Sequence, residues 1–590
     1  MKLVNIKIEG IPYQVEAGLT VLQAAKKCGY NIPTLCAFND GESSLASCRV
    51  CLVEVKGARG LVASCVYPIN EGMEIVISSP NAVNARRASV ELILSNHNKN
   101  CQQCRKNGKC ELLEVANITG ARDDKYPGVQ TKTTYDDLSD CLIRDTSKCI
   151  LCGRCVVRCK QAQGIGILGF ENRGFNTIVA PAQNRSFRDA PCINCGQCLN
   201  VCPTGALMEK DEIYRVDEAL SAGKKVIIQT APSVRATIAE EFGAPIGSKN
   251  QTGKMVAALH RLGFYRVFDT DFAADLTIME EAHEFLHRFK EKGVLPMFTS
   301  CSPGWVNFLE LFHPDLIPHA STCKSPHQMM GAIIKTYYAE KHQLDPKDLF
   351  VVSVMPCVSK KGEKERHYTN GLKDVDAVLT VRELARLIKR SGINWDRLPD
   401  EDYDNDLLHA ASGAGHIFGV SGGVMEAALR TAYHEITKKE YDQIAFEAIR
   451  GTTGTREATL DINGTVLKVA VVSGMANAVK ILKEVREGVS PYAFIEFMGC
   501  PGGCINGGGQ PYVFPSLLPK EDDDILKTYL AKRASVLYND DAKSVLRQSH
   551  NNPDIIKLYQ DYLGKPNSHR AHELLHTKYD AKRERFPKIN

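Results

Sequence analysis

The stretch "EFMGCPGGCINGGGQP" (Glu496–Pro511) places Cys500 and Cys504 in a glycine-rich segment near the end of a 590-residue chain. Glycines allow a backbone to come close to a bulky group, because no side chain stands between them. The pair does not suit an ordinary packed core. We therefore interpret this segment as one wall of a site that holds a metal cluster.

The cysteine content extends this interpretation to the whole chain. The sequence contains 22 cysteines, and disulfides are dense mainly in small secreted domains. The start "MKLVNIKIEG" alternates like a strand and does not resemble a signal peptide. No apolar run has the length of a membrane helix. We therefore expect a cytoplasmic protein, without membrane segments, whose cysteines bind metal.

Charge gives little sign of a nucleic-acid partner. The chain has 73 basic and 69 acidic residues, for a formal net charge of +4. It contains no basic tract interleaved with aromatic residues, which is the usual electrostatic footprint of nucleic-acid binding. Nucleic acid is therefore not an expected partner.

Residues 1–79 are predicted to form a small ferredoxin-like domain. The runs "LVNIKIEG" and "IPYQVEAG" indicate strands, and "TVLQAAKKCGY" indicates a helix. Four cysteines follow at the spacing C-x11-C-x2-C-x13-C: Cys36, Cys48, Cys51 and Cys65. This set suits a 2Fe-2S cluster. A four-cysteine zinc site is the alternative.

Residues 80–120 contain a second ligand set. A predicted helix, "NAVNARRASVELILSNH", leads into the pattern H-x3-C-x2-C-x5-C formed by His97, Cys101, Cys104 and Cys110. Taken alone, one histidine and three cysteines could bind zinc as readily as a 4Fe-4S cluster.

Residues 139–210 contain a repeat. "CILCGRCVVRCK" and "CINCGQCLNVCP" share the spacing C-x2-C-x2-C-x3-C, which is typical of bacterial two-cluster ferredoxins, where the fourth cysteine of each run ligates the other cluster. The first predicted 4Fe-4S cluster is therefore bound by Cys149, Cys152, Cys155 and Cys202. The second is bound by Cys192, Cys195, Cys198 and Cys159.

Residues 222–590 are predicted to form an α/β domain of the doubly wound type with a helical C-terminal tail. Apolar runs such as "KKVIIQTAP", "LFVVSVMP" and "VLKVAVVSG" alternate with helical stretches. Its loops contain Cys301, Cys357, Cys500 and Cys504. Any one of these alone would more often be a buried structural cysteine, which is our interpretation of Cys28 and Cys141. Cys323 has no partner at ligand spacing.

The loops "TSCSPGW", "MPCVSKK" and "EFMGCPGGCINGGGQP" together resemble those of iron-only hydrogenases of the large type with four accessory clusters. The resemblance implies that Cys301, Cys357, Cys500 and Cys504 hold the H-cluster, a 4Fe-4S cluster joined through Cys504 to a di-iron subcluster with CO, cyanide and a dithiolate. The accessory region also resembles the large iron-sulfur subunit of respiratory complex I, which implies that His97 is a ligand. The expected accessory cofactors are one 2Fe-2S and three 4Fe-4S clusters.

Other roles follow from the same resemblance. Lys360 and the segment Ala231, Pro232 and Ser233 are expected to contact the cyanides, and Met355 and Met498 to pack near the irons.

The resemblance also implies a proton route through Glu281, Glu284, Ser321 and Arg288. Helical spacing puts Glu281, Glu284 and Arg288 on one face. Without the resemblance, an exposed helix with ion pairs would be the preferred interpretation.

One position departs from the family pattern. The family commonly has two adjacent cysteines, a cluster ligand and a proton relay, where this chain has Cys301 and Ser302. Ligand strength favours Cys301 as the ligand and Ser302 as the relay, whereas a strict position match makes Cys301 the relay. His327 also stands where the family often has glutamine.

The implied activity is reversible H2 oxidation and proton reduction. The serine variant is similar to subunits of multimeric hydrogenases, including electron-bifurcating ones, so we expect a hetero-oligomer with ferredoxin or an NAD(P)H-oxidising flavoprotein and iron-sulfur subunits. The glycines of "GAGHIFG" do not form a G-x-G-x-x-G dinucleotide fingerprint in register, so we expect an NAD(P)H site to lie on a partner. The alternatives are a stand-alone ferredoxin hydrogenase, a non-catalytic iron-sulfur scaffold and an H2 sensor.

Overall fold

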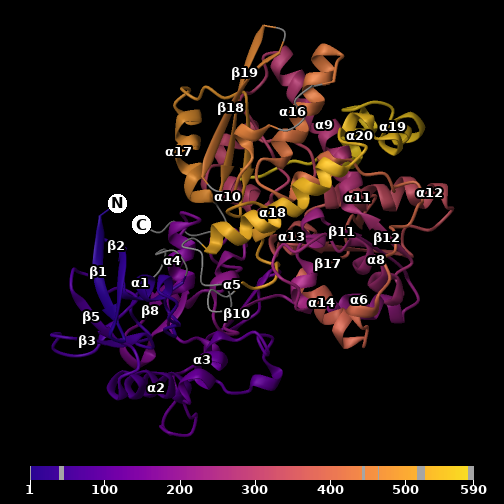
Figure 1. Ribbon diagram of the computed structural model, residues 1–590. Helices are drawn as coiled ribbons and strands as arrows, with labels where there is room; N and C mark the ends of the chain where they lie inside the picture. The colour runs from indigo at the N-terminus through magenta and orange to yellow at the C-terminus, as the bar shows by residue number, and fades with distance from the viewer. Residues whose placement is uncertain are drawn as a thin grey trace.

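A computed structural model describes residues 2–38, 45–440, 446–452, 454–462, 464–513 and 525–582. The indigo and purple N-terminal third forms small sheets and helices beside a larger α/β region, which the yellow C-terminal helices complete (Figure 1). The region expected to be α/β is therefore confirmed as α/β.

The N-terminal part is built on a five-stranded sheet of order β2-β1-β5-β3-β4. Its strands are β1 (Leu3–Ile8), β2 (Ile11–Glu16), β3 (Leu52–Val55), β4 (Val62–Ala63) and β5 (Met73–Val76). Alternate residues of β1 are buried and pack with those of helix α1 (Val21–Lys27). The two predicted strands and the predicted helix are thus confirmed.

Two helical segments follow this sheet. Helix α2 (Pro80–Ser95) begins after the Ser79 cap and packs on α3 (Glu111–Thr119), with the 3-10 turn η1 (Cys101–Gln103) between them in the chain. The next part contains the sheet β10-β7-β6 and the hairpin β8-β9. These strands are β6 (Tyr135–Asp136), β7 (Leu142–Asp145), β8 (Leu168–Glu171), β9 (Ile178–Pro181) and β10 (Leu207–Glu209).

The repeat in the sequence becomes a repeat in the fold. Helices α4 (Arg154–Gln161) and α5 (Gln197–Val201) pack on each other. Each begins after a left-handed glycine, Gly153 with φ 73° and Gly196 with φ 71°. A side chain would be strained in this conformation, which accounts for the glycine in both cysteine motifs.

The first sheet of the α/β region has the order β12-β11-β14-β17, and all its strands are parallel. They are β11 (Lys225–Thr230), β12 (Arg266–Asp269), β14 (Leu349–Met355) and β17 (Ala377–Thr380). The surrounding helices are α6 (Ile213–Ser221), α8 (Thr252–Arg261), α11 (Pro326–Ile333), α12 (Ala339–Lys341) and α14 (Val381–Arg390).

The second sheet has the order β13-β20-β19-β18, of which β18 is antiparallel. Its strands are β13 (Met297–Phe298), β18 (Thr455–Ile462), β19 (Thr465–Ser473) and β20 (Phe494–Met498). Its helices are α9 (Thr270–Lys290), α10 (Pro303–Phe312), α16 (Gly423–Thr437) and α17 (Met475–Arg486). The α/β region is thus built on two separate four-stranded sheets.

The C-terminal tail is helical, as expected, with α18 (Ile525–Lys543), α19 (Pro553–Leu558) and α20 (His569–Leu575). Helix α18 packs Leu530 and Leu537 against Val420 and Ile505. Within the described ranges, no helix is long and apolar enough to cross a membrane.

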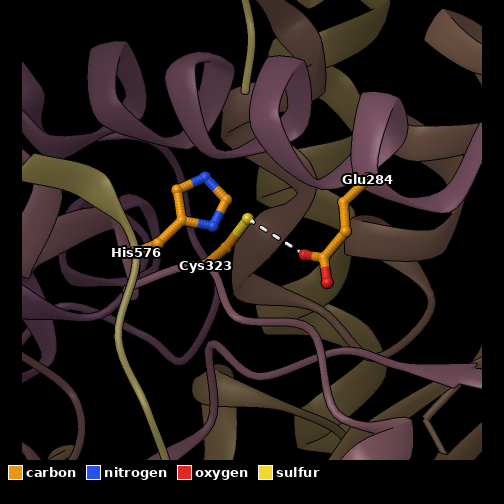
Figure 2. Close-up of side chains that lie close together, drawn as sticks. All are labelled: Glu284, Cys323 and His576. Carbon is orange, nitrogen blue, oxygen red and sulfur yellow. Dashed lines mark hydrogen bonds between the residues drawn. The ribbon is translucent and has the colours of Figure 1, made fainter. Parts of the chain in front are cut away.

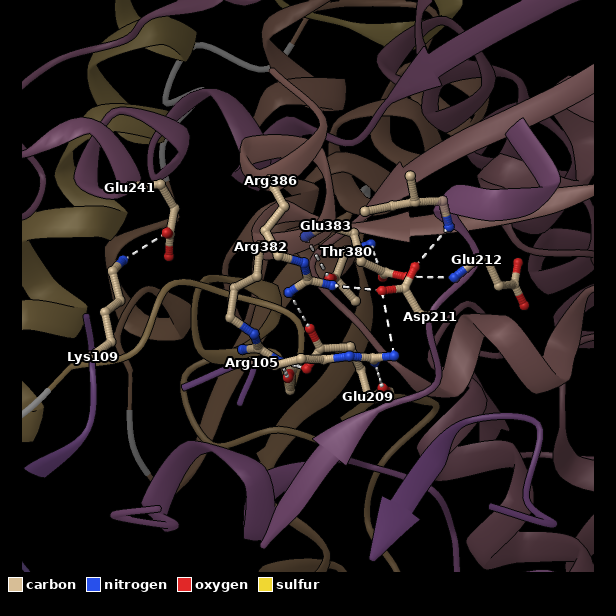
Figure 3. A network of polar contacts seen from close by, with 12 residues as sticks. Arg105, Lys109, Glu209, Asp211, Glu212, Glu241, Thr380, Arg382, Glu383 and Arg386 are labelled. Carbon is tan, nitrogen blue, oxygen red and sulfur yellow. Dashed lines mark hydrogen bonds and ion pairs between the residues drawn. The ribbon is translucent and has the colours of Figure 1, made fainter. Parts of the chain in front are cut away.

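A buried polar network joins the N-terminal part to the α/β region (Figure 3). Arg382 of α14 donates to the Glu209 carboxylate of β10 at 2.9 Å, to the carbonyl of Gly508 at 2.7 Å and to the carbonyl of Gln510. Arg386 donates to the other oxygen of Glu209 at 3.0 Å. Helix α14 therefore fixes the position of the ferredoxin-like part relative to the glycine-rich segment.

Candidate active site

The loops that carry the four late cysteines converge on one cavity. Strands β11, β13, β14 and β20 all end at its edge. In α/β folds, ligands bind at the carboxyl ends of parallel strands. The lining includes Cys301, Cys357, Cys500 and Cys504, and also Ala231, Pro232, Ser233, Ser302, Met355, Lys360 and Met498.

In the glycine-rich segment Glu496–Pro511, neighbouring backbone atoms leave no room for side chains at several glycines. A Cβ on Gly503 would lie 2.5 Å from the Ser421 nitrogen, and one on Gly507 would overlap the Pro356 carbonyl oxygen. Gly508 packs directly on Gly196 of the ferredoxin-like part. These glycines let three loops meet, in addition to the room for a cofactor that the sequence predicts.

The donor set fits a metal cluster. Burial, followed by the charge of the nearby Cys357, raises the pKa of the Cys504 thiol to about 12. Burial and the neighbouring thiols Cys357, Cys195 and Cys504 also raise the pKa of Cys500. Thiolates crowded in an apolar cavity need a compensating cation, which a cluster's iron atoms would provide.

Two hydrogen-bond donors occupy the cavity wall. The Ser233 hydroxyl is buried and has no partner among the described residues. Lys360 Nζ donates to the Cys301 carbonyl at 3.1 Å and pairs with Glu363 at 2.8 Å. An unpartnered buried hydroxyl fits a ligand that accepts hydrogen bonds, such as an iron-bound cyanide.

Sequence reasoning missed the support behind Lys360. Glu363, in α13 (Ser359–Glu363), pairs with Lys360 and also with His327 Nε2 at 2.6 Å. Burial, with the charge of Lys360, lowers the pKa of His327 to about 4, so the ring is neutral. His327 therefore fixes Glu363, which fixes Lys360. Glu363 lies three residues beyond Lys360 in a short helix, a signal that could have identified it.

The cavity also has an apolar wall that the motifs did not reveal. Phe418 and Pro326 line it beside the expected methionines. No local sequence pattern marks these positions, because distant elements bring them to the cavity.

The predicted acidic residues form a contiguous group on α9. Glu284 accepts hydrogen bonds from Ser321 Oγ at 2.8 Å and from Arg288 at 2.5 Å. Glu281 is fully buried, and this burial, with the charges of Glu284 and Glu496, raises its pKa to about 8. This face of α9 is therefore interior. The alternative of an exposed helix is wrong, although Glu284 and Arg288 do form an ion pair.

Cys301 and Ser302 face different neighbours. Cys301 packs with the apolar cluster that contains Phe418 and Met498. Burial raises the pKa of the Cys301 thiol, and the charge of Glu281 makes the second largest contribution. Ser302 Oγ instead accepts a hydrogen bond from the Gly499 nitrogen at 3.2 Å, next to Cys500. Cys301 thus lies on the carboxylate side, and Ser302 on the side of the glycine-rich segment.

Both interleaved cysteine sets come together in the ferredoxin-like part. One cavity is lined by the four cysteines assigned to the first cluster. For the second set, burial and the nearby thiols Cys195, Cys192 and Cys159 raise the pKa of Cys198.

The two earlier ligand sets also contain buried ligand candidates, among them all four cysteines of the first set. The sulfurs of Cys48 and Cys65 lie within hydrogen-bonding reach of Cys36, and that of Cys65 lies within reach of Cys51. His97 is buried, its Nδ1 has no partner among the described residues, and burial lowers its pKa to about 4. A neutral imidazole with an unsatisfied nitrogen fits a metal ligand.

The three cysteines that accompany His97 differ in exposure. Cys101 is exposed, and burial raises the pKa of Cys110, with a further contribution from Cys104. Gly205 lies against the Cys104 sulfur, where a Cβ would come within 2.6 Å.

The ligand sets form a continuous series in space. Cys36, Cys48 and Cys152 share one buried apolar cluster, against which Cys110 packs. At the other end, the Cys500 sulfur lies 4.0 Å from the Cys195 carbonyl oxygen. Neighbouring sets are therefore in contact from the N-terminal part to the main cavity.

Comparison with known proteins assigns a family description to each part of the chain. Residues 224–508 match the iron only hydrogenase large subunit, C-terminal domain, and residues 527–582 match the iron hydrogenase small subunit. Upstream, residues 1–80 match a 2Fe-2S iron-sulfur cluster binding domain, 86–125 the iron-sulfur binding region of NADH-ubiquinone oxidoreductase-G, and 148–207 a 4Fe-4S dicluster domain.

Relatives of similar length are also found. The NADP-reducing hydrogenase subunit HndD of Solidesulfovibrio fructosivorans is 48% identical over 99% of this chain and 100% of its own. Iron hydrogenase 1 of Clostridium pasteurianum is 43% identical over 98% and 99%. A solved structure of the [FeFe]-hydrogenase HydA1 from Chlamydomonas reinhardtii is 40% identical, with a TM-score of 0.55 over 62% of this chain and 98% of the other.

Proposed function

This chain belongs to the iron-only [FeFe] hydrogenase family, and from that premise we propose how its residues divide the work of a hydrogenase catalytic subunit. Its activity is the reversible interconversion of H2 with protons and electrons. The observation that carries the proposal is the single cavity that brings together the three cysteine loops and the Ser233 and Lys360 donors.

Cys357, Cys500 and Cys504 would hold the 4Fe-4S part of the H-cluster, and Cys504 would also hold its di-iron part. When bound, the cluster supplies the open iron at which H2 is made or split. Ser233 and Lys360 donate hydrogen bonds to the cyanides. Met355, Met498 and Phe418 exclude bulk water from the cavity.

A proton route connects the cavity to the surface. Arg288 and Glu284 form the outer end, where their side chains are 14% and 12% exposed. Ser321 and Glu281 continue inward, and the Glu281 pKa of about 8 keeps a transferable proton on that carboxyl at neutral pH. Cys301 lies between Glu281 and the cavity.

That position supports Cys301 as the inner proton relay and Ser302 as the side chain at the fourth corner of the cubane. Ligand strength supports the opposite assignment, because serine is a weak iron ligand. The two assignments predict different outcomes for Cys301→Ala. If Cys301 is the relay, Cys301→Ala keeps the electron paramagnetic resonance signal of the reduced 4Fe-4S cluster and loses H2 turnover. If Cys301 is a cluster ligand, Cys301→Ala loses that signal as well.

Electrons pass along the accessory sets. We propose one 2Fe-2S cluster on Cys36, Cys48, Cys51 and Cys65, and one 4Fe-4S cluster on His97, Cys101, Cys104 and Cys110. Two further 4Fe-4S clusters occupy the interleaved ferredoxin sets. The buried cluster shared by Cys36, Cys48 and Cys152, and the contact of Cys500 with Cys195, support a route from the first set through the ferredoxin sets to the cavity.

The partner is an NAD(P)H-oxidising flavoprotein with iron-sulfur subunits, or ferredoxin, within a hetero-oligomer in the cytoplasm. The full-length similarity to a subunit of an NADP-reducing hydrogenase supports this setting. A stand-alone hydrogenase that uses ferredoxin is the second candidate, supported by the full-length similarity to iron hydrogenase 1.

Infrared spectroscopy of the purified, matured protein tests the proposal. CO and cyanide bound to iron absorb between the protein bands and the C–H stretches, so sharp bands there are expected. Their absence from matured, iron-replete protein would contradict the proposed role of the cavity. Co-purification with a flavoprotein distinguishes the two partner settings.

A further inference from the structure

A second group of metal-binding side chains lies beside the proton route, in a place that no motif predicted (Figure 2). Glu284 comes from α9, Cys323 from the segment before α11, and His576 from the residue after α20. One ligand atom of each lies within 4.8 Å of the other two. Cys323 and His576 are also fixed to each other by an isolated β-bridge.

The surrounding contacts set the tautomer of His576. The Glu280 carboxylate accepts hydrogen bonds from the Tyr559 hydroxyl, from the Asn567 nitrogen at 2.8 Å and from His576 Nε2 at 3.0 Å. A carboxylate oxygen that already accepts from the Asn567 nitrogen is an acceptor for the ring as well, so His576 Nε2 is the donor of this hydrogen bond. The Nδ1 lone pair then faces Thr322, whose Oγ1 lies 2.7 Å away. A histidine oriented by a carboxylate is the usual arrangement behind a metal ligand.

One oxygen of the Glu284 carboxylate, Oε2, lies next to Cys323. The other oxygen, Oε1, pairs with Arg288, whereas Oε2 accepts from Ser321 Oγ at 2.8 Å, from the Thr322 nitrogen at 3.1 Å and hydroxyl at 3.4 Å, and from the Cys323 thiol at 3.7 Å. A cation that replaced the Cys323 proton would bind Oε2 without displacing Arg288. Cys323 is fully buried and Glu284 is 12% exposed, so access is from the Glu284 side.

We propose that Glu284, Cys323 and His576 form a binding site for a thiophilic divalent cation such as Zn²⁺ or Cd²⁺, and that binding there blocks the proton route. Thiolate, imidazole and carboxylate are the ligands of zinc in proteins, and the thiolate favours these ions over Mg²⁺ or Ca²⁺. Binding releases the Cys323 proton. One thiolate and one carboxylate then neutralise the 2+ charge.

The inhibitory part of this inference rests on the proposed function, because the cation would occupy the Glu284 oxygen that now accepts from Ser321. Ser321 and Glu284, which carry the proton between Glu281 and Arg288, would then no longer be able to pass it on. A bound cation would also tie the tail, which matches the small-subunit family, to the large-subunit domain.

X-ray absorption at the zinc edge tests the site directly, on the full-length protein with its iron-sulfur clusters and one equivalent of Zn²⁺. The expected shell has one sulfur and lighter N or O ligands. Cys323→Ser should remove the sulfur, and both Cys323→Ser and His576→Gln should weaken zinc binding at least about 10-fold. Glutamine can still donate to Glu280, which guards against misfolding.

The matched control is the His434, Glu440 and His550 cluster, which offers no sulfur. His434→Gln should leave the sulfur-containing shell unchanged. A zinc shell whose sulfur persists in Cys323→Ser, or a shell without sulfur, would overturn the proposal, because the metal would then sit on other residues.

Zinc titration of H2 evolution tests the consequence. The unaltered enzyme should slow as the site fills, whereas Cys323→Ser should stay active and resist zinc. Zinc binding without inhibition would overturn the blocking role. If the protein bound zinc through Cys323 but lacked the infrared bands of the H-cluster, the proposed function would fail and the metal site would stand.

Discussion

At the residue scale, burial sets the chemistry of this protein. Glu281 and His327 are both fully enclosed, but burial raises the pKa of the carboxyl to about 8 and lowers that of the imidazole to about 4. Each shift favours the neutral form, as expected for a group removed from water. Glu281 can therefore hold a proton for transfer, whereas His327 serves as a neutral support for Glu363.

Replacing Glu281 by glutamine tests its role in proton transfer. Glutamine keeps the shape and removes the titrating oxygen, so H2 evolution should fall by roughly 10²-fold or more, while the infrared bands of the H-cluster remain. Glu291→Gln is the matched control, because its side chain is 68% exposed next to the end of the same helix. Equal losses in both variants would argue against the route.

The same carboxyl predicts a pH dependence. The protonated form of Glu281 is the donor, and its pKa is raised to about 8, so H2 evolution should fall as the pH rises through about 8. Initial rates measured across this range, at a fixed driving force, test the prediction. If H2 evolution by Glu281→Gln falls at high pH in the same way, the titration belongs to another group.

At the element scale, helix α14 connects the two halves of the molecule. Arg382 binds Glu209 in β10 and the carbonyls of Gly508 and Gln510 in the glycine-rich segment. Both Arg382 and Glu209 are buried. Removing Arg382 would leave the buried Glu209 with Arg386 as its remaining partner and would take the donor from the two carbonyls. Losing one partner of a buried ion pair is more costly than losing both partners.

Arg382→Met should therefore destabilise the protein by about 3–5 kcal/mol. Arg390→Met, in the same helix, removes an exposed pair with Asp217 and should cost about 0–1 kcal/mol. Chemical denaturation compares them, and the double variant Arg382→Met with Glu209→Met should recover part of the loss. Similar midpoints for Arg382→Met and Arg390→Met would show that the network does not stabilise the junction.

At the scale of the whole molecule, ligand sets follow one another from the N-terminal sheet to the cavity. Their contacts come from different parts of the chain: Gly205 lies against Cys104, and Gly196 against Gly508. The second ferredoxin set lies next to the cavity, so it is the last step of the proposed electron route.

Breaking that last step should separate chemistry from electron transfer. In Cys198→Ala, exchange between H2 and deuterated water should continue, because it needs no external electrons. Reduction of the 2Fe-2S cluster by H2, followed by paramagnetic resonance, should slow by at least about 10-fold. Cys28→Ala is the control, since Cys28 is half-buried and assigned no ligand role. Unchanged reduction kinetics would mean that electrons take another path.

The sequence by itself determined the types of ligand, their order along the chain and the strands around them, because these depend on local spacing and periodicity. The two cysteine repeats, the buried run that became β14 and the helix that became α9 were all visible in this way. Only the tertiary structure decided which side chains meet. Cys323 had no partner at ligand spacing, yet folding brings it to Glu284 and His576. Cys301 and Ser302 are adjacent in the chain, yet one faces the carboxylates and the other Gly499. Such contacts depend on how distant elements pack, and local sequence patterns do not specify that packing.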